Sequence, residues 1–286
     1  MRRLRIAFQF LTILPVRIPD GIREDDFAGS VLFFPVVGAF QGALSVLAAM
    51  ALAHVLCAGT MCTSPAASVI SISIILLLII SNKGLHIDGL ADTCDALGIA
   101  PTGSTASDID KRLSVMKDSR IGAIGTIGIV GVVLMKFAVL DTLMTAQSRA
   151  AIYLLFFLMP VFSKWAMLAA LYSGTPARQD GLGRMFIGRV SLARFLGSTL
   201  ILSALTAAGI LIDGSVTVSG PAQSRLAVYL PLVILTCGII ALLYGFSRVS
   251  TWFFNKKFGG ITGDTLGAVN ELAEVLFLCA AVLWIK

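Results

Sequence analysis

Long apolar stretches recur along the whole chain and are separated by short polar segments. A helix needs about 20 residues to cross the roughly 30 Å hydrocarbon core of a bilayer, and seven of the stretches approach or exceed that length. The expected spans lie near residues 31–57, 66–82, 122–145, 151–172, 195–212, 226–246 and 266–285. The pattern predicts an all-α, polytopic integral membrane bundle, which we take as a single transmembrane domain over residues 1–286.

The first sixteen residues, MRRLRIAFQFLTILPV, have a basic start and a short apolar stretch. They resemble a signal peptide, but no small-residue cleavage site follows, and Pro15 and Pro19 end the stretch. We therefore expect an N-terminal interfacial or re-entrant helix, with a shallow eighth span as the alternative.

The composition supports the membrane assignment, because 57% of the residues are hydrophobic, 13% are charged and the mean hydropathy is +0.92. A soluble domain rarely has these values. The five cysteines form no CxxC pair and no zinc spacing. Cys57 and Cys62 fall at a predicted external turn, where we favour two unrelated small apolar residues over a disulfide. Since GxSxG, P-loop and HExxH motifs are missing from the sequence, hydrolase triads and Walker chemistry are set aside.

The basic residues are distributed asymmetrically. With the N-terminus inside, 17 of the 22 Lys and Arg residues fall in predicted cytoplasmic segments, while Lys136 and Lys164 lie within spans. Short loops rich in Lys and Arg stay in the cytoplasm, so we expect a multi-pass protein of the cell inner membrane with a cytoplasmic N-terminus. The net charge of +6 then reflects topology and gives no reason to invoke nucleic acid.

The stretch GLHIDGLADTCDALG, residues 84–98, places three acids after one of the most apolar runs. If the second span continues as a helix past Gly84, then Asp88, Asp92 and Asp95 stand at i, i+4 and i+7 on one stripe. Three like charges repel, and a magnesium ion completed by substrate phosphate oxygens is the usual solution. A solvated acidic helix end is the alternative. His86 is either a ligand or proton carrier, or a structural histidine.

Basic side chains follow in the same predicted loop, DIDKRLSVMKDSRIGAIGTIG, residues 108–128. Arg112, Lys117 and Arg120 offer donors to phosphate, and Asp118 is either a fourth carboxylate or the orienting partner of one of these bases. A topology anchor is the alternative for the whole segment. Gly122, with the glycines that follow it at 125, 128 and 131, indicates tight helix packing.

Two further polar clusters belong to the same predicted side. In ARQDGLGRMFIGRV, residues 177–190, Arg178, Asp180 and Arg184 lie among glycines, which suits either a phosphate loop or an anchored turn. In GGITGDTLGAVNELAEV, residues 259–275, Asp264 and Glu271 share a helix face at the start of the last span. Ionisable groups inside a span indicate function, because burial is costly unless they are paired or ligated.

These clusters meet near one cytoplasmic surface if the predicted topology holds. Carboxylates for metal ions beside bases for phosphates are the parts that phosphoryl-group transfer requires, since it needs charge neutralisation and positioning more than covalent help from protein.

Five separated blocks also resemble, in order, a known family. The blocks are FQFLTILPV, GLHIDGLADTCDALG, DKRLSVMKDSRIGAIG, DGLGRMFIG and GGITGDTLGAVNELAEVLFL. The chain resembles the cobalamin synthases, the adenosylcobinamide-GDP ribazoletransferases of bacterial and archaeal membranes, which act late in cobalamin biosynthesis. The family usually has Gly-Gly where this chain has Lys83-Gly84, and commonly glycine at Ala96.

The resemblance implies that a ribose hydroxyl of alpha-ribazole, or of its 5′-phosphate, attacks adenosylcobinamide-GDP and that GMP leaves. The product is adenosylcobalamin or its phosphate, Mg²⁺ is the expected cofactor, and the bilayer and other enzymes of nucleotide-loop assembly are the expected partners. The resemblance also includes a likeness in chemistry to CDP-alcohol phosphotransferases, which have an arginine where this chain has Asp92.

We assign roles to the predicted site residues from their position and charge. The expected metal ligands are Asp88, Asp92, Asp95, Asp118 and Asp264. The expected substrate-binding residues are His86, Arg112, Lys117, Arg120, Asp180 and Arg184. The expected catalytic residues are Asp264, Glu271, Arg120 and Lys117. The alternatives are another membrane phosphotransferase with a nucleotide-activated donor, and an ion-coupled transporter in which a buried acid such as Glu271 carries protons or cations.

Overall fold

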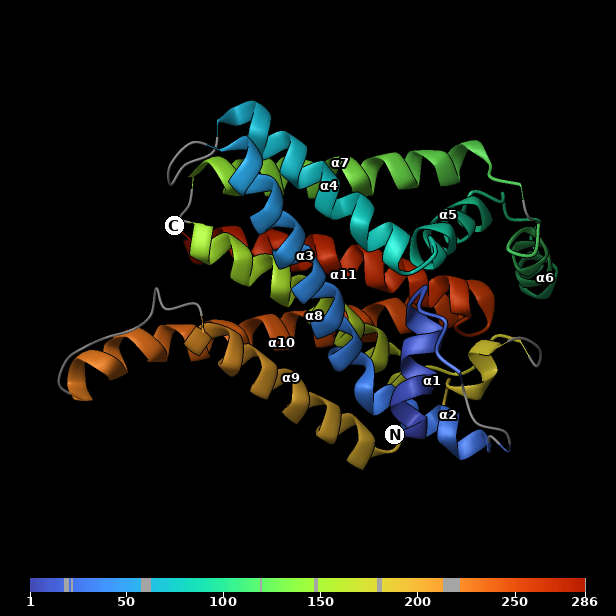
Figure 1. Ribbon diagram of the computed structural model, residues 1–286. Coiled ribbons are helices and arrows are strands. Elements are labelled where there is room, and N and C mark those ends of the chain that lie inside the picture. The colour runs from blue at the N-terminus through green and yellow to red at the C-terminus, as the bar shows by residue number, and fades with distance from the viewer. Residues whose placement is uncertain are drawn as a thin grey trace.

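The computed structural model describes residues 1–17, 21, 23–57, 63–118, 120–146, 149–178, 182–212 and 222–285. The described part is helical, with one isolated β-bridge (Figure 1). The α-helices are α1 (Arg2–Leu11), α2 (Glu24–Ser30), α3 (Phe34–Leu56), α4 (Ser64–Ser81), α5 (Leu85–Leu97), α6 (Thr105–Val115), α7 (Ala123–Ala146), α8 (Arg149–Ser173), α9 (Leu192–Ile212), α10 (Ala222–Phe258) and α11 (Gly263–Ile285). The 3₁₀ turns are η1 (Val31–Phe33) and η2 (Leu182–Met185).

Seven helical segments of the described chain are long and apolar enough to cross a membrane, which confirms the predicted all-α polytopic fold. They lie at 24–56, 64–81, 123–144, 152–173, 192–212, 230–258 and 263–282. The predicted end of the sixth span at residue 246 is wrong by twelve residues, because α10 continues to Phe258 through Arg248, Lys256 and Lys257. The length of an apolar stretch locates the apolar part of a helix, whereas the helix itself can continue into the polar segment that follows.

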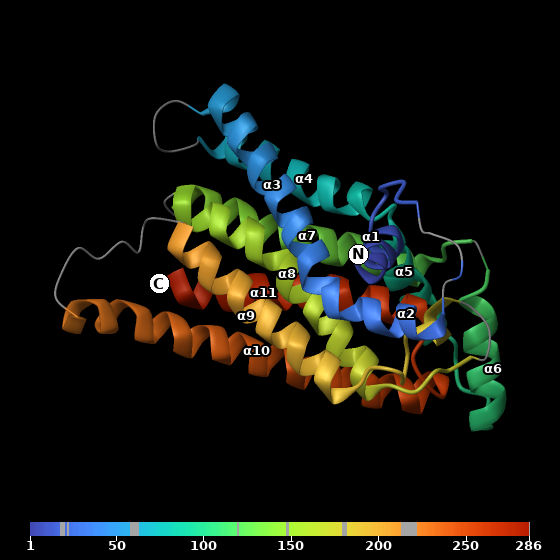
Figure 2. The same cartoon turned by 60° about the horizontal axis from the view of Figure 1, so that its bottom comes forward.

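Helix α8 lies at the centre of the bundle, packed against α3, α9, α10 and α11 (Figures 1 and 2). Small residues allow the closest of these approaches, since a Cβ on Gly42 would lie 2.2 Å from the backbone oxygen of Phe157. In contrast, α7, α9 and α10 expose large apolar side chains such as Leu134, Leu200 and Val233. These outer helices provide the surface that a bilayer would cover.

Helix α1 has ten residues, which rise about 15 Å, and is therefore too short to cross a bilayer. This length removes the eighth-span alternative. The helix packs on α2 and α3, and Arg3 Nη2 lies 2.7 Å from Asp25 Oδ2.

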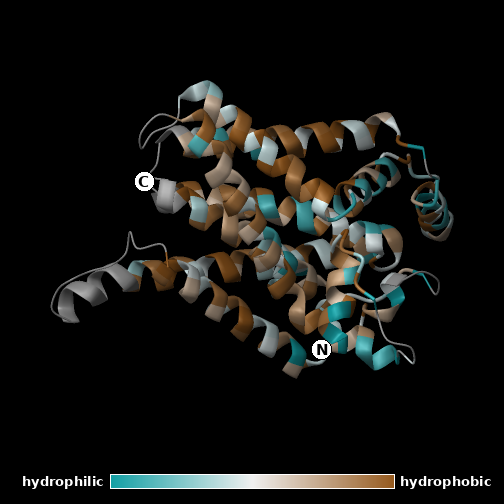
Figure 3. Ribbon diagram, in the orientation of Figure 1, coloured by the Kyte–Doolittle hydropathy of each residue, from teal (hydrophilic) through white to brown (hydrophobic). Residues whose placement is uncertain are grey.

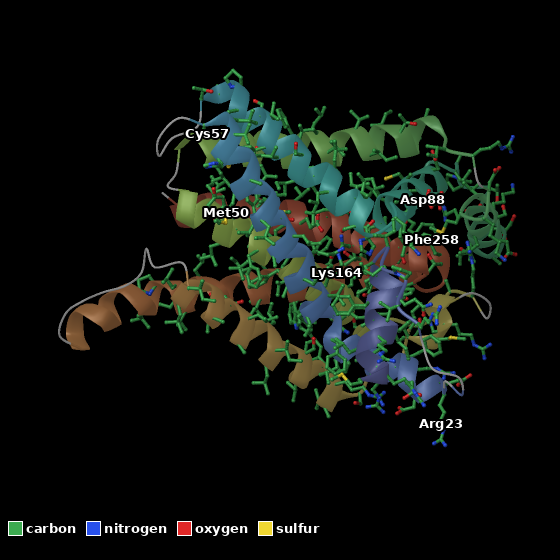
Figure 4. All side chains as sticks on the ribbon, in the orientation of Figure 1. Arg23, Met50, Cys57, Asp88, Lys164 and Phe258 are labelled. Carbon is green, nitrogen blue, oxygen red and sulfur yellow. The ribbon has the colours of Figure 1, made fainter. Side chains whose placement is uncertain are left out.

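Hydrophilic residues gather at one end of the bundle, around α1, α2, α5, α6 and η2, which we call the polar end (Figure 3). Asp88 and Arg23 lie at this end, and Cys57 lies at the opposite end (Figure 4). Cys57 is disulfide-bonded, so our preference for an unpaired residue at this position is wrong; Cys62 lies outside the described residues. Hydropathy alone cannot distinguish the two cases, because pairing depends on the geometry of the turn.

Candidate active site

The acidic stripe lies on a helix of its own. Helix α4 ends at Ser81, and α5 begins at Leu85 after Lys83 (φ 60°) and Gly84 (φ 71°) adopt left-handed conformations. The expected continuation of the second span is therefore wrong. Two left-handed residues redirect the chain, and glycine adopts this region without the steric cost that other residues have. The stripe itself is retained, because α5 carries all three aspartates.

Helices α5 and α11 cross with their backbones in contact. A Cβ on Gly89 would lie 2.6 Å from the backbone oxygen of Asp264, and a Cβ on Gly267 would lie 2.9 Å from that of His86. Only glycine permits this separation at both points. The crossing brings the α5 carboxylates to the first turn of α11, where Thr262 Oγ1 donates to Asp264 Oδ2 at 3.3 Å.

The pKa of Asp92 is affected by carboxylates of both helices, α5 and α11. Burial raises the pKa of Asp92 to about 7, and the charges of Asp88, Asp264 and Asp95 act in the same direction, while Arg178 opposes them. Carboxylates that raise one another's pKa are stabilised in the charged form by a cation placed between them.

Arg178 is held beside this cluster by the backbone. The Pro176–Ile261 bridge joins the chain before Arg178 to the chain before α11, with Ala177 N donating to Ile261 O at 3.0 Å. Arg178 Nη2 donates to Leu113 O at 2.6 Å, and its Nε is buried without a hydrogen-bond partner. The structure thus adds Arg178 to the predicted site residues; its place in the glycine-rich segment 177–190 is the signal for it in the sequence.

A cavity of about 240 Å³ opens next to Asp264. Its polar lining residues are Arg178, Arg184, Thr262 and Asp264. The remaining wall is mainly apolar and includes Phe10, Leu85, Met167, Ile187, Ile261 and Leu266. Arg184 thus lies at the site, whereas the predicted Asp180 lies outside the described residues.

Asp95 has a different environment from its two companions. Its Oδ2 accepts from Gly122 N at 2.7 Å and its Oδ1 accepts from Gly125 N at 2.8 Å, at the start of α7. A carboxylate on free helix N–H groups stabilises the helix terminus. These contacts fit a structural role in fastening α7 to α5, and metal binding by Asp95 stays a prediction.

The basic side chains of residues 112–120, which we predict to donate hydrogen bonds to phosphate, lie partly at the surface and partly in the interior. Arg120 is exposed and pairs with Asp118 at 2.7 Å, the arrangement in which Asp118 orients a base, and this pairing lowers the pKa of Asp118. Lys117 is exposed. Arg112 is buried, and its Nη1 donates to Lys257 O at 3.2 Å. Substrate binding by these bases stays a prediction.

Glu271 lies in a buried ionic cluster about two helical turns from Asp264. Lys136 Nζ is 2.6 Å from Glu271 Oε2 and 2.5 Å from Glu274 Oε2, and Lys164 Nζ donates to Asn270 Oδ1 at 2.8 Å. The partners of these two lysines could not be predicted, because nothing in the sequence pairs α7 or α8 with α11. The direct catalytic role of Glu271 stays a prediction.

His86 is buried beside this cluster. Its Nδ1 lies 3.1 Å from Asn82 Nδ2, and its Nε2 has no hydrogen-bond partner. Burial lowers the pKa of His86 well below its ordinary value, and the charges of Lys164 and Lys136 lower it further. A neutral, buried imidazole fits the structural alternative better than substrate binding.

Among the described residues, no group of three or more His, Cys, Asp or Glu side chains is arranged to hold a metal ion unaided. Magnesium commonly takes one or two protein carboxylates and completes its shell with water and substrate phosphates. This mode of binding fits the carboxylates of Asp88, Asp92 and Asp264, which lie at the crossing of α5 and α11. Arg178 lies beside them, and its guanidinium group is suited to binding phosphate.

The crossing gives a first prediction. Gly89→Ala should lower the turnover of the enzyme about 100-fold, because the new methyl forces Asp264 away from the α5 carboxylates and an error of about 1 Å has such a cost. Overpacking should also lower the free energy of unfolding by about 1–3 kcal/mol. The matched control is Gly131→Ala on α7, where a Cβ meets nothing within 4 Å. Equal turnover in the two purified variants would contradict a role for the close packing of α5 against α11 in positioning Asp264.

Comparisons with known proteins show the family of the chain. Residues 3–282 match the family model described as Cobalamin-5-phosphate synthase. The chain is 34% identical to the adenosylcobinamide-GDP ribazoletransferase of Thermodesulfovibrio yellowstonii over 284 residues, covering 99% of this chain and 96% of the relative. It is 33% identical to that of Geotalea daltonii over 286 residues, covering 99% and 97%. It is 32% identical to that of Escherichia coli over 273 residues, covering 95% of each.

No solved structure matches the chain. The family match extends over nearly its whole length, and the relatives exceed 30% identity over almost all of both sequences. The chain therefore belongs to the cobalamin-5-phosphate synthase family.

Proposed function

We propose that this protein is an adenosylcobinamide-GDP ribazoletransferase, which joins adenosylcobinamide-GDP to alpha-ribazole or its 5′-phosphate and releases GMP. The observation that carries the proposal is the contact of α5 and α11, which collects Asp88, Asp92 and Asp264 beside Arg178 at the polar end. Full-length similarity to proteins with this name supports it.

In this proposal a ribose hydroxyl oxygen of the acceptor forms a new bond to the corrinoid-linked phosphorus of the donor. The bond from that phosphorus to the bridging oxygen breaks, and GMP leaves with the electron pair. Asp264 accepts the hydroxyl proton or shares the metal ion, and Arg178 and Arg184 hold phosphate oxygens. Asp88 and Asp92 would hold a magnesium ion, which would supply positive charge to the pyrophosphate as the bond breaks.

We also propose a cytoplasmic N-terminus and an inner-membrane location. The polar end carries the predicted cytoplasmic basic segments, and its acids face the compartment that supplies nucleotides. Cys57 is disulfide-bonded at the opposite end, and disulfides persist in oxidising compartments such as the periplasm. Cysteine-accessibility labelling from each side of right-side-out membrane vesicles tests the orientation.

The direct test of the function is magnesium-dependent release of GMP. Purified protein in nanodiscs should release GMP when it receives adenosylcobinamide-GDP, alpha-ribazole and Mg²⁺ together, and the new phosphodiester should appear in equal amount by mass spectrometry. Omission of the acceptor or chelation of the metal should stop both. GMP release without the phosphodiester would indicate hydrolysis and would overturn the assignment.

The raised pKa of Asp92 predicts a pH-dependent requirement for magnesium. Below pH 7 the carboxyl mostly holds a proton that the metal must displace, so the apparent affinity for Mg²⁺ should rise about fivefold from pH 6 to pH 7 and about twofold more from pH 7 to pH 8. Magnesium titrations of GMP release at pH 6, 7 and 8 measure this. Asp92→Asn should bind Mg²⁺ weakly at all three pH values; equal affinity of the wild type at pH 6 and 8 would contradict the prediction.

The transporter alternative depends on a buried acid that exchanges ions with water. Among the described residues, Glu271 and Glu274 are instead paired with Lys136 in the interior. Substrate-driven cation flux in vesicles, in the absence of GMP release, would favour transport over the proposed transfer.

A further inference from the structure

The cavity beside Asp264 is too small for either complete substrate. Pockets for drug-sized ligands measure about 300–1,000 Å³, and this one measures about 240 Å³. It can take one ring system of a substrate while the rest remains outside. The candidates that the proposed reaction supplies are the guanine of the donor and the benzimidazole of ribazole, since the corrin ring is far larger.

The wall of the cavity distinguishes these two bases. Most of the lining side chains are apolar, contributed by α1, the start of α5, α8, the turn after η2, and α11 with the residue Ile261 before it. Guanine carries several hydrogen-bonding groups along its edge, and each one buried without a partner costs binding energy. In the proposed reaction Arg178 and Arg184 bind phosphate and Asp264 faces the ribose hydroxyl, so these side chains are not available to a guanine edge. Dimethylbenzimidazole has two methyl groups and a single free ring nitrogen once it is joined to ribose. Its surface matches an apolar wall.

The cavity also has polar lining residues, which are Arg178, Arg184, Thr262 and Asp264. Asp264 lines the cavity and also contacts α5 through its backbone, next to Gly89. Arg178, whose buried Nε has no partner, lines the same cavity. A base held against apolar lining residues such as Met167 and Ile187 therefore leaves Asp264 and Arg178 of the same cavity for its ribose.

We propose that this cavity binds the benzimidazole base of the acceptor and orients its ribose toward Asp264, leaving the guanosine of the donor outside. The proposal rests on the proposed function, because that function supplies the two candidate bases.

Gly183 offers a way to fill the cavity. A Cβ at this position would lie 3.2 Å from Gly263 N and 3.4 Å from Ile187 Cδ1, and the backbone φ is not in the left-handed region. Gly183→Leu should raise the KM for alpha-ribazole at least tenfold and change the KM for adenosylcobinamide-GDP less than twofold. Gly131→Leu on α7, where a Cβ meets nothing within 4 Å, is the matched control and should change either KM less than twofold. Met167→Phe, which fills the cavity from α8, should act in the same direction if Gly183→Leu does not fold.

A binding measurement separates this proposal from the reaction itself. Free 5,6-dimethylbenzimidazole should bind the purified wild type in nanodiscs by calorimetry, and Gly183→Leu should weaken this binding at least tenfold. Guanosine should not displace it. If guanosine displaces the probe, or if Gly183→Leu raises the KM of the donor instead, the cavity binds the nucleotide and the proposal is overturned.

The failures of the two proposals look different. Unchanged KM values for both substrates and no binding of the probe would show that the cavity is no substrate site, although GMP release by the wild type would continue. Binding of the probe without GMP release would leave the cavity assignment standing and would overturn the proposed function.

Discussion

Asp264→Asn is expected to reduce the rate of GMP release about 10³-fold, because the amide can neither accept the ribose proton nor supply negative charge to a metal ion. The side chain lies on the first turn of α11, half-buried, and accepts a hydrogen bond from Thr262 Oγ1. An amide retains that contact as an acceptor. The expected loss is therefore one of chemistry, with the fold unchanged, and single-turnover release of GMP at saturating substrates measures it.

The control for this substitution is Asp110→Asn on α6, an exposed acid at the same end of the bundle. It removes the same charge and should keep the wild-type rate within about twofold, as surface substitutions usually do. The thermal midpoints of both variants should match that of the wild type. A rate for Asp264→Asn above one tenth of the wild-type value would remove Asp264 from the catalytic residues.

The elements that could be predicted from the sequence are those whose signal is local. Apolar length alone located seven spans, because a bilayer imposes that length on any helix that crosses it. The 3.6-residue period of a helix placed Asp88 and Asp92 on one face of α5 even though the helix expected to carry them was interrupted at Lys83. The periodicity depends on the residues of α5 and not on how α5 is joined to α4.

The features that the sequence could not provide are contacts between distant segments. Arg178 enters the site through a bridge from Pro176 to Ile261, which are 85 residues apart. Asp95 resembles its neighbours in sequence, yet its oxygens meet the first N–H groups of α7. Spacing identifies which side chains share a face, whereas the partner opposite that face is decided by packing.

Lys136→Met is expected to lower the free energy of unfolding by about 3–5 kcal/mol, because it leaves Glu271 and Glu274 buried with too little positive charge. Both carboxylates contact the Lys136 ammonium and are almost fully buried. Lys164 is the remaining cation, and its Nζ donates to Asn270 rather than to either glutamate. Denaturant unfolding of the protein in mixed micelles measures the loss, and Lys111→Met on the exposed side of α6 should stay within about 0.5 kcal/mol of the wild type.

Charge balance in the cluster can be restored by a second substitution. Lys136→Met with Glu271→Gln removes one charge of each sign and leaves Lys164 with Glu274, so the double variant should recover to within about 1–2 kcal/mol of the wild type, as neutral replacements of buried ion pairs do. GMP release per folded molecule by this variant then tests the predicted catalytic role of Glu271, which lies about 10 Å along α11 from Asp264. If Glu271→Gln alone abolishes release while stability is unchanged, the carboxylate acts directly in the reaction, as its sequence position first predicted.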